Sequence, residues 1–479
     1  MVHTFYKKHL QRKDCIMNIK DKQIPNIHHL SIHTLLDGAK ETYMLDPEAF
    51  KGERIKKGLR NSDGTGVVAG VTGIGLVHGY VVDEGEKCPV DGKLYYRGYD
   101  VEDIVNYYSS HDKFGYEECS YLLLMGELPT SAELEHYDEV LNYYRQLPQG
   151  FVEDVVMRAP NESIMSKIAQ SVLALSAYDP SPDDISFENV LVQSAQLVAR
   201  LPIIAASAYA VKRHVFQNKS LTLHNPKQGL STSENFLRVV RSDKSFTRDE
   251  AKLLDLCLIL HAEHGGGNNS TFTCRSLTST GTDTYSAIAG ALGALKGPRH
   301  GGANIKVVEM LDDIKANVRD THDEDELRDY LLKILDKKAN DNSGLIYGMG
   351  HAVYTKSDPR SVILKRFASE MVTNSEFAED FKLLNTIERI SPALLVQKTS
   401  IPREDFVSSS IDMYSGIIFR MLRIPEDMFT PLFAIARISG WCAHRMEELI
   451  TSHKIIRPAY KYAGDIRNYI SPDERFKCE

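Results

Sequence analysis

The sequence predicts a mostly α-helical fold with a few short strands near its N-terminus. After Val101, most segments carry apolar residues at three- and four-residue spacing, which is typical of helices with one buried face. Segments rich in Val, Ile and Tyr and broken by glycines occur only before that point. With 479 residues, 42% of them hydrophobic, the chain is long for one compact unit, so we expect two domains.

The strand region comes first. The segments from Val67 to Val82 and from Lys93 to Tyr99 are rich in β-forming residues and are interrupted by glycines and by Asp-Gly pairs such as Asp91-Gly92, so we expect short hairpins there. Residues 1–50 before them are polar. They predict either a flexible arm or a segment that packs on a partner subunit.

Helices follow along the rest of the chain. The clearest helical patterns run from Ala132 to Leu147, Phe187 to Arg200, Arg248 to His261, Ala303 to Ala316 and Asp325 to Lys337. Polar segments from Gln217 to Ser233 and from Asn340 to Gly344 predict surface connections between helices.

Charge and cysteine content narrow the function classes. The chain has 57 basic and 65 acidic residues and no sustained basic stripe, which argues against nucleic acid or an anionic membrane as a partner. Seven cysteines lack C-x-x-C spacing, so we expect reduced thiols in a cytoplasmic protein. The segment from Met1 to Lys20 has no apolar core of a secretory signal, and the apolar run from Leu201 to Val211 is too short to span a bilayer.

Three histidines stand beside glycines in the second half of the chain. They are His264 in His-Gly-Gly-Gly-Asn, His300 in Gly-Pro-Arg-His-Gly-Gly-Ala-Asn, and His351 in Gly-Met-Gly-His-Ala-Val. Glycine lets the backbone bend sharply and lets a ligand approach it, which suits an imidazole that faces a pocket. Three such sites predict one active centre.

His300 precedes a helical pattern that begins at Ala303. The partial positive charge of a helix N-terminus should keep this imidazole neutral, which makes it a hydrogen-bond donor to a developing oxyanion. A histidine that only caps a buried helix is the alternative.

Two further segments carry charges that suit a site. Ser357-Asp358-Pro359-Arg360 is typical of a helix start with a capping residue and an arginine that can face an anion, or else a solvated arginine. Asp412 lies in an apolar neighbourhood that could raise its pKa and suit it to proton abstraction, or it is an ordinary N-cap. Arg437 and Arg457 also have apolar flanks, where each arginine needs a structural ion pair or an anionic ligand.

Taken together, these segments resemble citrate synthase, from the strands between Thr72 and Tyr99 to Arg457-Pro458. His264 and His300 are 36 residues apart, His351 follows after 51 more, and Arg360 after a further 9. The motifs Gly-Pro-x-His-Gly-x-Ala-Asn and Gly-x-Gly-His-x-Val with Asp-Pro-Arg are specific to that family.

The resemblance implies condensation of acetyl-CoA with oxaloacetate in the tricarboxylic acid cycle, followed by hydrolysis of a citryl thioester. Asp412 would remove a methyl proton, His300 would stabilise the enol or enolate oxygen, and His351 would polarise the oxaloacetate ketone. The substrate would be held by His264, Arg360, Arg437 and Arg457. Ser270 would orient His300, unless it is only a solvated loop serine. No metal and no tightly bound cofactor are expected, and acetyl-CoA is a co-substrate.

The resemblance also implies a nearly all-helical homodimer in which Arg457 enters the partner's site. By analogy the chain divides into an arm at 1–50, a large domain at 51–301 and 422–479, and a smaller mobile domain at 302–421 with its hinge beside His300. The chain departs from some relatives at Gly265, where they carry an acid. It also has Thr355 at a basic position near CoA, which leaves Lys356 as the nearest CoA-binding candidate.

Three alternatives remain. A 2-methylcitrate synthase would use propionyl-CoA with the same catalytic residues, because one methylene changes binding by only about 1–3 kcal/mol. His261-Ala-Glu263-His264 could begin a zinc site of a metallohydrolase, although no third ligand is evident. A catalytically silent binding module is the third.

Overall fold

The computed structural model describes most of the chain after residue 54. The described residues are 55–61, 64–84, 86–373, 375–399, 401, 403–404, 407–452, 454–463 and 466–472. Residues 68–457 form one unit, and the described residues before and after them belong to a second. The second unit contains a short 3-10 turn, η2 (Lys57–Leu59). The predicted arm at 1–50 lies outside the described residues.

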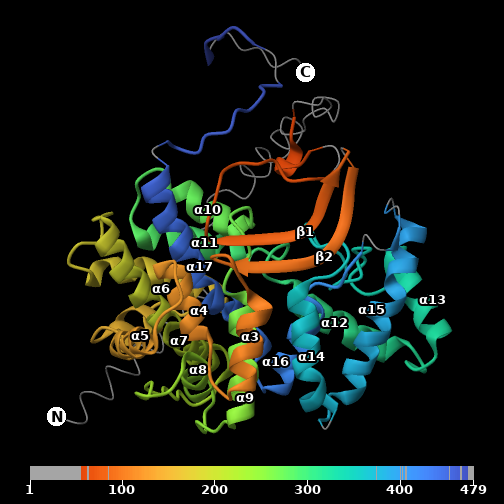
Figure 1. Cartoon of the computed structure of the whole chain (residues 1–479), viewed down its shortest axis with the longest axis horizontal. Helices are drawn as coiled ribbons and strands as arrows, with labels where there is room; N and C mark the ends of the chain where they lie inside the picture. Colours follow the sequence, from red (N-terminus) through yellow and green to blue (C-terminus); the bar gives the residue numbers. More distant parts are fainter. Residues whose placement is uncertain are drawn as a thin grey trace. The chain divides into compact units, whose positions relative to one another are not determined.

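The predicted mostly helical fold is confirmed, with one small antiparallel sheet of order β1-β2-β3 among the described residues (Figure 1). β1 (Gly75–Asp83) and β2 (Glu86–Tyr96) form the long hairpin, and β3 (Tyr99–Asp100) adds a short edge. The register pairs Gly75 with Tyr96 at one end and shifts between His78 and Tyr80. The expected hairpin is therefore present, but Asp91-Gly92 lies inside β2 instead of forming a turn.

Helices fill the chain from Val101 to Lys296. They are α3 (Val101–Ser110), α4 (Tyr116–Met125), α5 (Ser131–Tyr144), the π-helical η3 (Val152–Met157), α6 (Ile164–Leu175), the 3-10 turn η4 (Ser176–Tyr178), α7 (Phe187–Gln217), α8 (Thr232–Val240), α9 (Arg248–His261), α10 (Asn269–Thr278) and α11 (Thr284–Lys296). Three of them begin with reciprocal capping boxes, at Thr130 and Glu133, Ser231 and Glu234, and Thr247 and Glu250. A Ser or Thr followed by Glu three residues later satisfies two backbone N–H groups, which explains these starts.

The long helix α7 extends to Gln217, well beyond the predicted end at Arg200, and contains Pro202. It is the one helix in the described part of the chain that is long and apolar enough to cross a membrane, but 78% of its apolar window is buried inside the protein. Tertiary packing of this apolar surface outweighs the cost of the proline.

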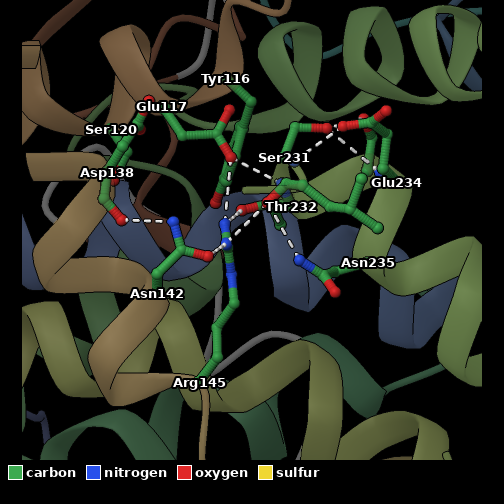
Figure 2. Close-up of polar contacts among 12 residues, drawn as sticks. Tyr116, Glu117, Ser120, Asp138, Asn142, Arg145, Ser231, Thr232, Glu234 and Asn235 are labelled. Atoms are coloured by element: carbon green, nitrogen blue, oxygen red, sulfur yellow. Dashed lines mark hydrogen bonds and ion pairs between the residues drawn. The ribbon is translucent and has the colours of Figure 1, made fainter. Parts of the chain in front are cut away.

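A buried ion pair joins α4, α5 and α8. Arg145 Nη2 lies 3.3 Å from Glu117 Oε1, and the same guanidinium donates to Thr232 Oγ1 at 3.1 Å (Figure 2). Glu117 also accepts the Thr232 backbone N–H at 2.6 Å. Both charges of this ion pair therefore have partners, which offsets the cost of burying them.

The remaining helices are α12 (Ala303–Asn317), α13 (Glu324–Leu335), α14 (Pro359–Thr373), α15 (Ala378–Lys398), α16 (Asp412–Met421), the short η6 (Glu426–Met428) and α17 (Phe429–Thr451). Helices α12 to α16 pack among themselves, and α14 also contacts α9 and β2. The almost entirely buried α17 packs against α4, α7, α9, α10 and α11. The five cysteines within the described residues are free thiols, and Cys15 and Cys478 lie outside those residues.

Candidate active site

One pocket of about 720 Å³ brings together most of the residues that the sequence singles out. Its lining includes the six predicted residues His264, His300, His351, Arg360, Asp412 and Arg437. They come from five separate segments: the ends of α9 and α11, the loop before α14 and the first turn of that helix, the start of α16, and the middle of α17. The structure thus brings these six residues together around one pocket.

His300 lies in the turn between α11 and α12. The next residue must be glycine, because a Cβ at Gly301 would stand 2.3 Å from the Leu295 carbonyl oxygen. Burial, with a further contribution from the Arg437 charge, lowers the pKa of His300 to about 4. The imidazole is therefore neutral near pH 7, as predicted. The prediction attributed this to the helix N-terminus, whereas burial and a neighbouring cation lower the pKa in the structure.

Ser270 fixes the His300 ring. Its hydroxyl lies 3.0 Å from His300 Nε2, and its backbone N–H donates to the same nitrogen at 3.3 Å. A backbone N–H can only donate, so Nε2 is the acceptor and Nδ1 carries the proton of the neutral ring. Ser270 is fully buried in the first turn of α10 and accepts from Trp441 Nε1 at 3.2 Å, so the solvated-loop interpretation is wrong.

His351 is held by its own loop. Its Nδ1 accepts the backbone N–H groups of Val353 at 3.1 Å and Tyr354 at 3.0 Å. Two donors at Nδ1 leave the proton of the neutral ring on Nε2. The loop itself is tied to the serine run before Asp412, because Gly350 N donates to Ser408 O and Ser410 N donates to Gly348 O, both at 2.8 Å.

His264 follows the end of α9 and is almost fully buried. Its Nε2 has no hydrogen-bond partner among the described residues, and its ring meets the His351 ring edge-on at 5.2 Å. Burial, followed by the charge of Arg360, holds the pKa of His264 well below its usual value. A buried, neutral nitrogen that lacks a partner suits a ligand hydrogen bond.

The zinc alternative finds no support in this geometry. Helix α9 ends at His261, so His261 and His264 do not share a helical face, and His261 Nδ1 bonds to the Cys257 carbonyl at 2.6 Å. Within the described ranges, no group of three or more His, Cys, Asp or Glu side chains is arranged to hold a metal ion.

Arg360 lies just inside α14, where Asp358 caps the helix by accepting the Arg360 N–H at 3.0 Å. The same carboxylate holds the guanidinium through Nε at 3.0 Å and Nη2 at 2.7 Å. Arg360 is only 4% exposed, so it is not a solvated arginine. Its planar group is oriented by Asp358 while it lines the pocket.

Arg437 is buried in α17, and its Nε donates to the His261 carbonyl at 2.6 Å. No carboxylate of the described chain forms an ion pair with it. Burial lowers its pKa, against a smaller opposing effect of Glu263. Since the expected structural ion pair is missing, an anionic ligand is the remaining way to compensate this charge.

Asp412 is the first residue of α16. Burial raises its pKa to about 6, although Arg360 opposes the shift. The Ser410 hydroxyl donates to Asp412 Oδ2 at 3.4 Å. The predicted elevation is confirmed, and the group is a carboxylate at neutral pH that is more basic than an exposed aspartate.

Three predicted residues do not line this pocket: Ser270, which contacts His300, and Arg457 and Lys356. Arg457 is exposed beyond the end of α17 and has no ion pair within the described residues. Lys356 is exposed and lies 3.0 Å from Asp91 of the hairpin. The pocket also contains residues that the sequence interpretation missed, among them Arg299, Lys306 and Tyr347. Arg299 stands in the same Gly-Pro-Arg-His motif as His300, and its position there was the available signal.

Known proteins resemble this chain over most of its length. The family model for the C-terminal domain of citrate synthase matches residues 65–459. A citrate synthase of Synechocystis sp. is 34% identical over 80% of this chain and 89% of its own length. A 2-methylcitrate synthase of Shewanella oneidensis is 32% identical over 78% of this chain and 88% of its own.

A solved structure is also similar. Citrate synthase of Thermoplasma acidophilum, in a ternary complex with carboxymethyl coenzyme A and oxaloacetate, superposes with a TM-score of 0.71 and 27% identity. The match covers 88% of this chain and the whole of that one. The family model matches most of this chain, and the relatives are similar to it over most of their own length. This chain therefore belongs to the citrate synthase family.

Proposed function

We propose that this chain condenses acetyl-CoA with oxaloacetate and water to give citrate and free CoA. The observation that carries the proposal is the pairing of pKa values in one pocket. Asp412, raised to about 6, is a base at neutral pH, while His300, lowered to about 4, is a neutral donor. Opposite pKa shifts of two neighbouring groups suit acid and base roles at pH 7.

In the first step, the Asp412 carboxylate takes a proton from the methyl carbon of acetyl-CoA. The electron pair moves to the thioester oxygen, which accepts a hydrogen bond from His300 Nδ1–H. A carboxylate is a far weaker base than the carbanion. A positioned base contributes only about 10² to 10⁴-fold, so this donor must stabilise the enol or enolate.

In the second step, the enol carbon attacks the ketone carbon of oxaloacetate. The ketone oxygen becomes an alkoxide and is stabilised by His351 Nε2–H, because Nδ1 is occupied by two backbone donors. The proton that Asp412 removed balances protonation of this alkoxide, which gives citryl-CoA and restores the carboxylate. Water then cleaves the thioester, which releases citrate, the CoA thiol and a proton. No metal or tightly bound cofactor enters these steps, since side chains supply the base and the donors.

Arg360 and Arg437 bind the oxaloacetate carboxylates in this scheme, and the unpartnered His264 Nε2 completes the substrate contacts. A guanidinium matches a carboxylate bidentately, and both arginines are buried, where such bonds are strongest. Arg299, exposed in the pocket lining, supplies positive charge for the CoA phosphates, and Lys306 lines the same pocket but is paired with Glu309 at 2.7 Å. Lys356, outside the pocket and paired with Asp91, is the weaker candidate for CoA.

We further propose a homodimer in which Arg457 reaches the partner subunit's pocket. The exposure of Arg457 and its absence from the pocket of its own chain support this arrangement. The mutual packing of α12 to α16 supports a smaller mobile domain at about 302–421. Movement of such a domain would exclude water during condensation. We also propose that the enzyme is cytoplasmic, because the cysteines of the described residues are free thiols, which are typical of a reducing compartment.

The test is release of free thiol from acetyl-CoA, with and without oxaloacetate, with propionyl-CoA in parallel. Release that requires oxaloacetate and favours acetyl-CoA supports citrate synthase. A preference for propionyl-CoA assigns 2-methylcitrate synthase instead, the activity named for one of the relatives. No release from folded protein with either thioester would overturn the proposed catalysis and favour a binding role.

A further inference from the structure

The β1–β2 hairpin lies directly against residues 353–357, which follow His351. A Cβ at Gly92 would stand 2.1 Å from the Ser357 carbonyl oxygen and 2.8 Å from both Pro359 Cδ and Tyr354 Cδ1. A Cβ at Gly79 would stand 2.8 Å from the Val353 carbonyl oxygen. Real Cβ atoms do not approach so closely, so the backbone of each strand touches this loop.

Gly79 and Gly92 are required because a side chain would clash with the loop, and not because of backbone conformation, since neither has a positive φ. Glycine weakens a strand interior and often marks a close approach of another backbone. This explains why Asp91-Gly92, whose sequence predicts a turn, lies within β2.

Polar contacts hold the same surface together. Gly92 N donates to Ser357 Oγ at 3.0 Å, and Thr355 Oγ1 donates to the Gly79 carbonyl at 3.2 Å. The Tyr354 hydroxyl donates to the Lys93 carbonyl at 3.4 Å. The hairpin thus contacts the loop at both glycines and at the buried tyrosine between them.

Tyr354 connects the hairpin to the histidine. It is fully buried, and its ring stacks on the His351 ring with centroids 4.8 Å apart and planes 29° from parallel. Its backbone N–H is one of the two donors to His351 Nδ1. A shift of Tyr354 therefore moves both the stacked face of the imidazole and the bond that selects its tautomer.

We infer that Gly79 and Gly92 are positioning residues for His351 and act through Tyr354. The inference rests on the proposed role of His351 at the oxaloacetate ketone. A Cβ at either site forces the loop outward, and a displacement of about 1 Å in a catalytic group can cost about 10²-fold in rate. The effect of Gly79 belongs to turnover and not to substrate capture, since its contacts are with Val353 and Tyr354, whereas Gly92 also meets Pro359, the residue beside Arg360.

The experiment compares Gly79→Ala and Gly92→Ala with Gly70→Ala, whose Cβ would meet no atom within 4 Å. We expect kcat to fall by about 10- to 100-fold in the first two, with little change in the KM for oxaloacetate in Gly79→Ala, and no change in either constant in Gly70→Ala. The infrared carbonyl stretch of bound oxaloacetate should also move toward that of the free ketone. A wild-type kcat and carbonyl stretch in folded Gly79→Ala and Gly92→Ala would overturn the inference.

Tyr354 provides a second measurement if the glycine variants do not fold. Tyr354→Leu removes the stacked ring and should lower kcat. Tyr354→Phe should keep most of the wild-type kcat, since Phe keeps the ring and loses only the bond to Lys93. An equal kcat in both variants would contradict the inference.

A measurement on the His351 ring distinguishes failure of this inference from failure of the proposed function. The ¹⁵N shifts of His351, assigned with His351→Gln, report its tautomer without substrate. The Nε2–H form should dominate in the wild type and Gly70→Ala, and should be less populated in Gly92→Ala. If the wild type releases no thiol but this difference persists, the positioning holds and the proposed reaction fails. Identical shifts in all three proteins would refute the positioning.

Discussion

His300 Nε2 is bound by Ser270 twice, through the hydroxyl at 3.0 Å and through the backbone N–H at 3.3 Å. Because the backbone group can only donate, this relationship assigns the imidazole proton to Nδ1. The same Ser270 hydroxyl accepts from Trp441, so α10 and α17 together orient a residue of the α11–α12 turn.

Ser270→Ala should lower kcat by about fivefold, because the ring keeps its backbone bond and loses the bond to the hydroxyl, which contributes about 1 kcal/mol. Steady-state kinetics with acetyl-CoA would measure this, with Ser276→Ala on the same helix as the control. An unchanged kcat in a variant of lower thermal stability would reduce Ser270 to a structural role toward Trp441.

Asp412→Ala should lower kcat by about 10² to 10⁴-fold while oxaloacetate still binds, since the carboxylate is proposed as a base and not as an anchor. Calorimetric titration with oxaloacetate checks binding separately. Asp412→Asn, which keeps the volume and removes the charge, should behave in the same way. Near-normal turnover in either variant would refute the mechanism.

The pH profile should follow Asp412. Its active form is the carboxylate and its pKa is about 6, so kcat/KM for acetyl-CoA should rise as pH increases through 6 and level off near 7. His300, with a pKa of about 4, stays neutral over this range and should add no second ionisation to the profile. A profile that is flat from pH 5 to 7 would exclude Asp412 as the base.

The same shift affects stability. The folded pKa of Asp412 exceeds the unfolded value of 3.8, so the folded state binds more protons between about pH 4 and 6. Its contribution to the free energy of unfolding therefore decreases as pH rises through that window. Urea unfolding of the wild type and Asp412→Asn at pH 4.5 and 7 should show a smaller decrease for the variant. Equal decreases would argue against the raised pKa.

Arg437→Met should raise the KM for oxaloacetate by about 10- to 150-fold, equivalent to about 1.5–3 kcal/mol for hydrogen bonds to a charged group. The melting temperature without ligand should not fall greatly, because the variant removes a buried charge that has no carboxylate partner in the described chain. A large loss of stability with an unchanged KM would identify Arg437 as a structural residue.

Arg457→Ala and Asp412→Ala subunits should each be inactive alone and regain activity when mixed, because one site of the heterodimer would hold both intact residues. Mixed chains with two different affinity tags would isolate that heterodimer. No regain in the verified heterodimer would remove the shared-site proposal.

Local signals in the sequence were sufficient for much of the helical fold. The predicted bounds of α9, Arg248 to His261, agree with the structure because Thr247 and Glu250 form a capping box and the apolar period is clear. The predicted helical pattern from Phe187 ended too early, at Arg200. The helix continues through Pro202 to Gln217 in a buried environment that sequence spacing does not reveal.

The sequence by itself determined which residue types are available and where glycine permits sharp bends, because these depend on neighbours along the chain. The three glycine-flanked histidines were predicted as one centre on this basis, and the resemblance to citrate synthase added Asp412 and the arginines to them. Only the tertiary structure decided that Arg360 has Asp358 as its partner while Arg437 has no carboxylate partner in the described chain. Likewise, the causes of the His300 pKa and the position of Gly92 inside β2 arise from burial and from contacts between segments remote in sequence. Such electrostatic and steric effects depend on distances in space, which residue spacing does not contain.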